Sequence, residues 1–110
     1  LQNETIYLMC HKDLKNRVSA KRFLFDLIIS NEMPVRNLDL GRIANDVNRL
    51  HPGILLEFLS EEHTNIECLC WEVWQTIRYA AEEEEGGFEK LREIVRVNPS
   101  FAANFYYIIT

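Results

Sequence analysis

The chain has 110 residues, of which 47% are hydrophobic and 26% are charged, and its formal net charge is −5 at pH 7. These values are typical of a globular protein and exclude a disordered chain, and the length suits one domain with its own core. The acidic balance argues against general nucleic-acid binding, because affinity for phosphates comes largely from Lys and Arg.

The cysteines and the start of the chain indicate its setting. Cys68 and Cys70 stand two apart on a predicted helix, so they point to opposite sides and cannot readily pair. Three cysteines without an obvious pairing favour a reduced intracellular compartment, cytoplasmic or nuclear. Neither a secretory leader nor a membrane span is predicted. Because the chain starts at Leu1 and not at methionine, we expect a single helical domain, residues 1–110, excised from a longer protein.

Hydrophobic periodicity predicts three helices in the first half of the chain. Asn3 can cap a short helix over residues 4–10, and Ser19 can cap a second over residues 20–30. Asp39 can cap a third helix that runs to Leu50, with its polar residues on the face opposite the core.

Four further segments are predicted after His51-Pro52-Gly53 interrupts this pattern. They cover residues 54–59, a long stretch of about 65–85, residues 88–95, and residues 101–109 with Ser100 as the cap. Without the short first segment the total is six. Short connections predict antiparallel packing of successive helices. The expected fold is therefore all-α: a compact antiparallel bundle of about six helices with one long central helix over about 65–85.

The long segment has a capping box at its start, Thr64-Asn65-Ile66-Glu67, and Gly86-Gly87 at its end to supply a positive φ. Apolar residues fall on both of its sides. The stripe predicted as core contains Ile66, Leu69, Cys70, Val73, Ile77, Ala80 and Ala81. The opposite side holds Cys68, Trp71 and Tyr79, and Trp74 lies at the edge of the stripe. Such a helix either lies at the centre of a bundle or presents one side to a partner.

The chain contains no motif for catalysis, metal binding or nucleotide binding. Zinc sites usually need two closely spaced pairs of ligands, which Cys10-His11, His63, Cys68 and Cys70 do not supply. No Gly-rich phosphate loop is present either. We therefore expect no catalytic residues, no metal, no cofactor and no small-molecule substrate. An enzyme would require the Cys and His residues to converge in one pocket.

The densest positive charge lies near the N-terminus. Residues 1–50 carry eight Lys/Arg against six Asp/Glu, and residues 51–110 carry four against eleven, so the halves have net charges of +2 and −7. The basic patch comprises Lys12, Lys15, Arg17, Lys21 and Arg22. We interpret it as solvated surface, as a contact for nucleic acid, or as the counterpart of the acidic run Glu82–Glu85, which the helix dipole disfavours at a helix C-terminus.

The predicted function is protein–protein interaction or assembly within a larger intracellular protein. The expected partner-binding residues are Trp71, Trp74, Arg78 and Tyr79, because Trp, Tyr and Arg dominate interface hot spots. The partner would be another protein or a second copy of this chain, whose association would also cover the apolar segment 101–109. Nucleic-acid binding through the basic patch is the alternative function. In the competing interpretation, the long helix is central and both its faces are core.

Overall fold

Five α-helices and four short helical turns make up the part of the chain that the computed structural model describes, residues 12–30, 35–66 and 69–101. The α-helices are α2 (Arg17–Leu24), α3 (Asn37–Leu50), α4 (Ile54–Glu62), α5 (Trp71–Glu83) and α6 (Gly87–Val97). The turns are η1 (Lys12–Lys15), η2 (Phe25–Ile29, a π-helix), η3 (His63–Asn65) and η4 (Pro99–Phe101). The all-α class is confirmed, with five α-helices among these residues instead of about six. The segment expected over 4–10 lies outside the described residues, as does the segment expected over 101–109 except for Phe101, which ends η4.

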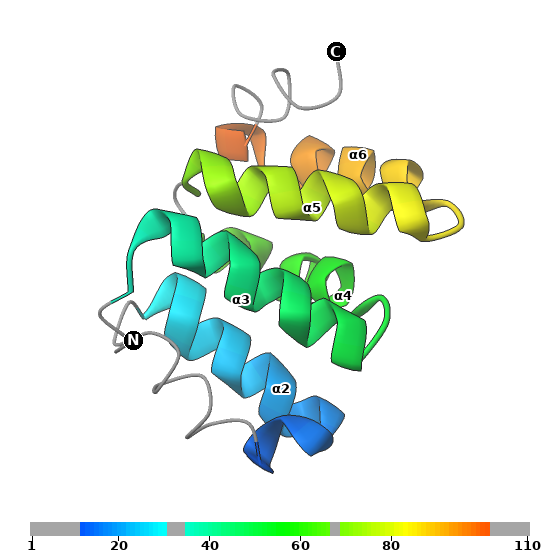
Figure 1. Cartoon of the computed structure of the whole chain (residues 1–110). Helices are drawn as coiled ribbons and strands as arrows, with labels where there is room; N and C mark the ends of the chain where they lie inside the picture. Colours follow the sequence, from blue (N-terminus) through cyan, green and yellow to red (C-terminus); the bar gives the residue numbers. More distant parts are fainter. Residues whose placement is uncertain (1–11, 31–34, 67–68, 102–110) are drawn as a thin grey trace.

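The helices form two layers. In Figure 1, α3 and α5 lie side by side with α4 and α6 behind them, and α2 lies on the side of α3 away from α5. Helix α4 packs against α2, α3, α5 and α6, and the most extensive contact of all joins α3 to α5. None of the described helices is both long and apolar enough to cross a membrane.

Helices α3 and α5 run in the same direction. At their starts, the Cys70 thiol lies 4.0 Å from the carbonyl oxygen of Asn37. Near their ends, Asn48 and Ala80 line one hollow between the two helices. The expectation of antiparallel packing concerned successive helices, and α3 and α5 are not successive because α4 lies between them in the chain. The intervening helix α4 carries the chain back in the second layer, so α3 and α5 become parallel neighbours.

The central helix is α4 and not the segment 65–85. Its apolar residues are buried nearly all round its axis, as expected for a helix covered on several sides. They are Ile54, Leu55, Leu56, Phe58 and Leu59. The buried hydrophobic residues of all five α-helices join them in one core.

The predicted long helix begins later than expected, at Trp71, so α5 has 13 residues and α3, with 14, is the longest described helix. Thr64 lies in η3, where Asn65 donates a hydrogen bond to Glu62 Oε2 at 2.7 Å, and Glu67 lies outside the described residues. Ile66 is extended, with φ −109° and ψ 112°, and its side chain is buried. The capping-box prediction is therefore wrong. Ile66 and Leu69 are both buried although neither lies in a helix.

Two other helix starts also differ from the predicted ones. Helix α2 begins before Ser19, because Asn16 Oδ1 accepts hydrogen bonds from the N–H groups of Val18 at 2.8 Å and Ser19 at 3.3 Å. Helix α3 begins at Asn37, so Asp39 lies in its first turn and forms ion pairs instead of capping it. By contrast, Gly86 has the positive φ that was predicted, at 71°.

Close contact between α3 and α5 depends on Gly41. A Cβ atom at this position would lie only 2.7 Å from the backbone oxygen of Glu72. The Thr76 hydroxyl on α5 lies 3.0 Å from the carbonyl oxygen of Gly41 on α3 and 3.1 Å from that of Glu72 on its own helix, so its one proton is shared between acceptors on the two helices. Gly41 and Thr76 together fix the spacing of the two helices.

We predict that Gly41→Ala lowers the free energy of unfolding by about 1–3 kcal/mol, because the added methyl group would meet backbone atoms that cannot easily move. Intrinsic helix propensity alone predicts the opposite sign, a gain of about 1 kcal/mol. Urea unfolding followed by circular dichroism measures the difference. Asn45→Ala, one turn further along α3, is the control and should change stability by less than about 0.5 kcal/mol. A stabilised Gly41→Ala protein would show that the two helices are not held this closely.

Candidate partner-binding groove

Large apolar side chains stand exposed along the seam between α3 and α5. The exposed fractions are 67% for Leu38 on α3, and 55% for Trp71 and 57% for Tyr79 on α5. The two aromatic residues are two helical turns apart, about 12 Å along the axis. Between the helices lies a hollow of about 440 Å³, which we call the aromatic groove; its lining includes Leu38, Arg42, Asn45, Trp71, Gln75 and Tyr79. Trp71 and Tyr79, which the sequence left open between core and interface, are therefore on the surface.

Trp74 does not belong to this surface. Its side chain is 1% exposed and is part of the hydrophobic core, so the prediction that it contacts a partner is wrong. Helix α5 packs against α3, α4 and α6, and its buried arc is therefore wider than a single stripe of about 100°. Cys68 lies outside the described residues. Arg78 is exposed and forms an i,i+4 ion pair with Glu82, at 3.3 Å.

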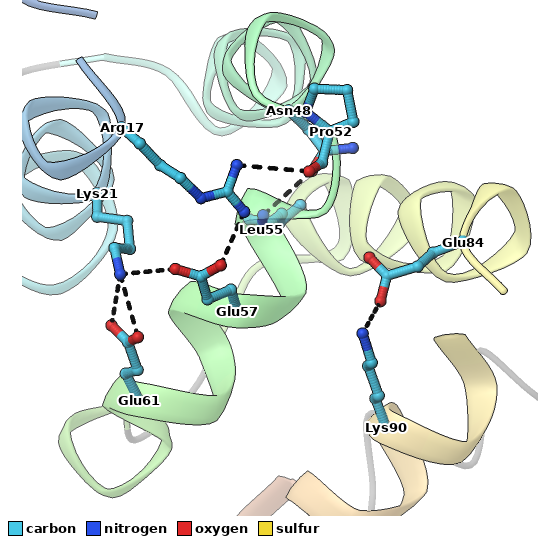
Figure 2. Close-up of polar contacts among 9 residues, drawn as sticks. All are labelled: Arg17, Lys21, Asn48, Pro52, Leu55, Glu57, Glu61, Glu84 and Lys90. Atoms are coloured by element: carbon cyan, nitrogen blue, oxygen red, sulfur yellow. Dashed lines mark hydrogen bonds and ion pairs between the residues drawn. The ribbon is translucent and has the colours of Figure 1, made fainter. Parts of the chain in front are cut away.

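Two residues of the basic patch form ion pairs with α4. Figure 2 shows Arg17 and Lys21 directed at Glu57, with Nη2–Oε1 and Nζ–Oε2 distances of 2.7 Å each. Lys21 also reaches Glu61 at 3.1 Å. These ion pairs join α2 to α4 and compensate two of the positive charges.

The other described side chains of the basic patch, Arg22 and Lys15, lie on the surface. The Arg22 guanidinium lies 3.4 Å from Asp26 and 5.7 Å from the centre of the Phe25 ring. Lys15 is exposed, and the side chain of Lys12 lies outside those that the structure describes. Two of the five patch residues, Arg17 and Lys21, are thus engaged in a network with α4, whereas Arg22 and Lys15 stay exposed.

Two members of the acidic run Glu82–Glu85 form ion pairs with cations of α5 and α6. Glu82 pairs with Arg78, and Glu84 pairs with Lys90, as Figure 2 shows for the latter. The hypothesis that this run meets the Lys12–Arg22 patch within the molecule is not borne out by the described side chains, because Glu57 and Glu61 occupy that position. Glu83 and Glu85 are exposed and form no ion pair among the described residues.

The cysteine and histidine residues that could serve as metal ligands do not come together in the described part of the structure. No group of three or more His, Cys, Asp or Glu among the described residues could hold a metal ion. His63 Nδ1 lies 2.9 Å from the carbonyl oxygen of Ser60, and His51 Nε2 contacts that of Leu14. Burial raises the pKa of the Cys70 thiol, which disfavours the reactive thiolate. Cys10, His11 and Cys68 lie outside the described residues.

The aromatic groove is thus the one place among the described residues where two predicted partner-binding side chains, Trp71 and Tyr79, share a hollow with an exposed apolar neighbour. Comparison with protein-family models, with curated proteins and with solved structures finds no match to this chain.

We predict losses of stability of very different size for the two tryptophans of α5. Trp74→Ala should cost about 3–5 kcal/mol of stability, because it leaves a large cavity in the core. Trp71→Ala should cost less than about 1 kcal/mol, since the side chain is half exposed. Chemical denaturation of both variants measures this difference. Equal losses would mean that Trp71 is also a core residue.

The ion-pair network predicts a pH dependence. Hydrogen bonds from Arg17 and then from Lys21 lower the pKa of Glu57 from 4.5 to about 2. A carboxyl group with a lowered folded-state pKa stabilises the fold above its unfolded pKa, and this contribution is lost as the pH falls towards the folded value. Allowing for screening of the 38% exposed side chain, we expect Glu57→Gln to cost about 1 kcal/mol at pH 7.

This cost should stay constant above about pH 5 and disappear towards pH 2. The carboxyl group of wild-type Glu57 becomes protonated over this range, so it is then neutral like the amide of the variant. Stability of both proteins measured across this range provides the test. Glu89→Gln, which removes an exposed pair within α6, is the control and should give a difference close to zero at every pH. A Glu57→Gln cost that does not change with pH would contradict the ionic origin of the stabilisation.

Proposed function

We propose that this chain is a protein-interaction module that binds its partner in the aromatic groove between α3 and α5. The observation that carries the proposal is the pair of half-exposed aromatic side chains, Trp71 and Tyr79, beside exposed Leu38. Aromatic residues are the commonest hot spots of protein interfaces, because they bury a large area with few rotatable bonds.

Rigidity of the groove supports this proposal. Its aromatic side chains stand on α5, and α5 is fixed against α3 by the approach at Gly41 and by the Thr76 hydroxyl. The opposite side of α5 is held in the core by Trp74 and Ile77. A surface that is already ordered loses less conformational entropy when a partner binds.

Nucleic-acid binding, the alternative function, receives less support. It depends on the basic patch, and Arg17 and Lys21 are already paired with Glu57 and Glu61 at distances of 2.7–3.1 Å. To bind phosphates, these cations would have to give up contacts that join α2 to α4. We therefore favour the aromatic groove as the binding surface.

We predict that Trp71→Ala/Tyr79→Ala weakens partner binding while the fold persists. A partner recovered with the wild-type chain and then purified should bind the double variant at least about tenfold more weakly, because two hot-spot side chains are lost. Titration calorimetry measures the affinity, and sedimentation of the chain alone over a range of concentrations shows whether the partner is a second copy.

The matched control is Val18→Ala/Val97→Ala, which removes two exposed apolar side chains from α2 and α6, away from the groove. Its affinity should equal that of the wild type. Unchanged binding by the aromatic variant, or an equal loss in the control, would rule out the groove as the binding surface.

A further inference from the structure

The seam between α3 and α5 continues beyond the aromatic groove to an acidic end. One turn further along both helices lies a second hollow, of about 520 Å³. Its lining includes Asn48 and Arg49 from α3, and Ala80, Glu83, Glu84 and Glu85 from α5 and the turn that follows. The seam therefore passes from apolar and aromatic side chains to carboxylates.

Two independent features make this end of the seam negative. Helices α3 and α5 are parallel, so the negative ends of both helix dipoles lie here. Glu83 and Glu85 add two exposed charges that no ion pair among the described residues neutralises. Arg49, the one cation lining this hollow, lies 3.9 Å from Asp46. A positively charged group of a bound molecule would be stabilised at this position.

We infer that the occupant of the seam is a basic amphipathic helix of a partner protein, with its apolar face on Trp71 and Tyr79 and Lys or Arg side chains at Glu83 and Glu85. This inference rests on the proposed function and adds the chemistry of the partner. A helix suits the site because its backbone polar groups are bonded internally, so an apolar face can lie in a groove between two helices. The 14 residues of α3 extend about 21 Å, which accommodates about four turns of a bound helix.

A second copy of the chain offers no such helix among its described residues. Helix α2 is basic, but Ala20, Phe23 and Leu24 of its apolar face are buried, and Arg17 and Lys21 are engaged by α4. The cations of α6 are each paired with a nearby glutamate. The basic helix is therefore assigned to a different protein.

The test uses displayed peptides of about 18 residues, with apolar residues fixed at helical positions i, i+3, i+4 and i+7 and all other positions free. Peptides are selected on the wild-type chain and counter-selected on Trp71→Ala/Tyr79→Ala, so that only groove-dependent binders remain. The recovered peptides should be enriched in Lys and Arg. Their binding, measured by fluorescence anisotropy, should weaken as the salt concentration rises.

Glu83→Gln/Glu85→Gln should weaken the selected peptides by about three- to tenfold, as expected for the loss of two exposed charge contacts. Glu89→Gln/Glu93→Gln removes the same charge from α6, outside the seam, and should leave the affinity unchanged. Groove-dependent peptides without basic enrichment, or equal losses in the two variants, would overturn this inference and leave the proposed function intact. A selection that yields no peptide dependent on Trp71 and Tyr79 would overturn both.

Discussion

Burial of the apolar side chains of α4 is the constraint from which the arrangement of the other helices follows. Its five buried apolar side chains, from Ile54 to Leu59, require cover on several sides, and α2, α3, α5 and α6 provide it. Because α3 and α5 both pack on α4, they come to lie beside each other and in the same direction (Figure 1). Their seam, with exposed aromatic residues at one end and carboxylates at the other, is a consequence of this layering.

Ion pairs and hydrogen bonds among the described residues connect the two layers, and Glu83 and Glu85 stay outside them. Glu57 is bonded by two cations of α2, and Asn48 of α3 accepts a hydrogen bond from the N–H of Leu55 at 3.1 Å, which caps the start of α4 (Figure 2). Glu84 lies over Gly53, where a Cβ atom would stand 2.8 Å from Oε1. These contacts connect the two layers, whereas Glu83 and Glu85 project from the seam without an ion pair among the described residues.

Local signals predicted some elements and failed for others. Within α5, the helical period correctly separated Val73, Ile77 and Ala80 from Trp71 and Tyr79. It failed for Trp74, because three neighbouring helices widen the buried arc. The predicted cap at Thr64 also failed, because Thr64 lies in η3, and Ile66 and Leu69 are buried although neither is helical. A capping motif contributes about 1 kcal/mol, less than the burial of two such side chains.

The sequence by itself determined the helical class, most members of the core and the separation of Trp71 and Tyr79 from the core stripe of α5, because these depend on the spacing of apolar residues along one helix. That Trp71 and Tyr79 are exposed was decided by the tertiary structure. Only the tertiary structure decided that α4 is central, that α3 and α5 are parallel, and that the basic patch is paired with Glu57 and Glu61. Each of these depends on contacts between residues far apart in the chain. The contact at Gly41 shows the reason. A glycine within a helix does not reveal from the sequence which segment will pack against it, and the need for glycine appears only when the backbone of Glu72 lies next to it.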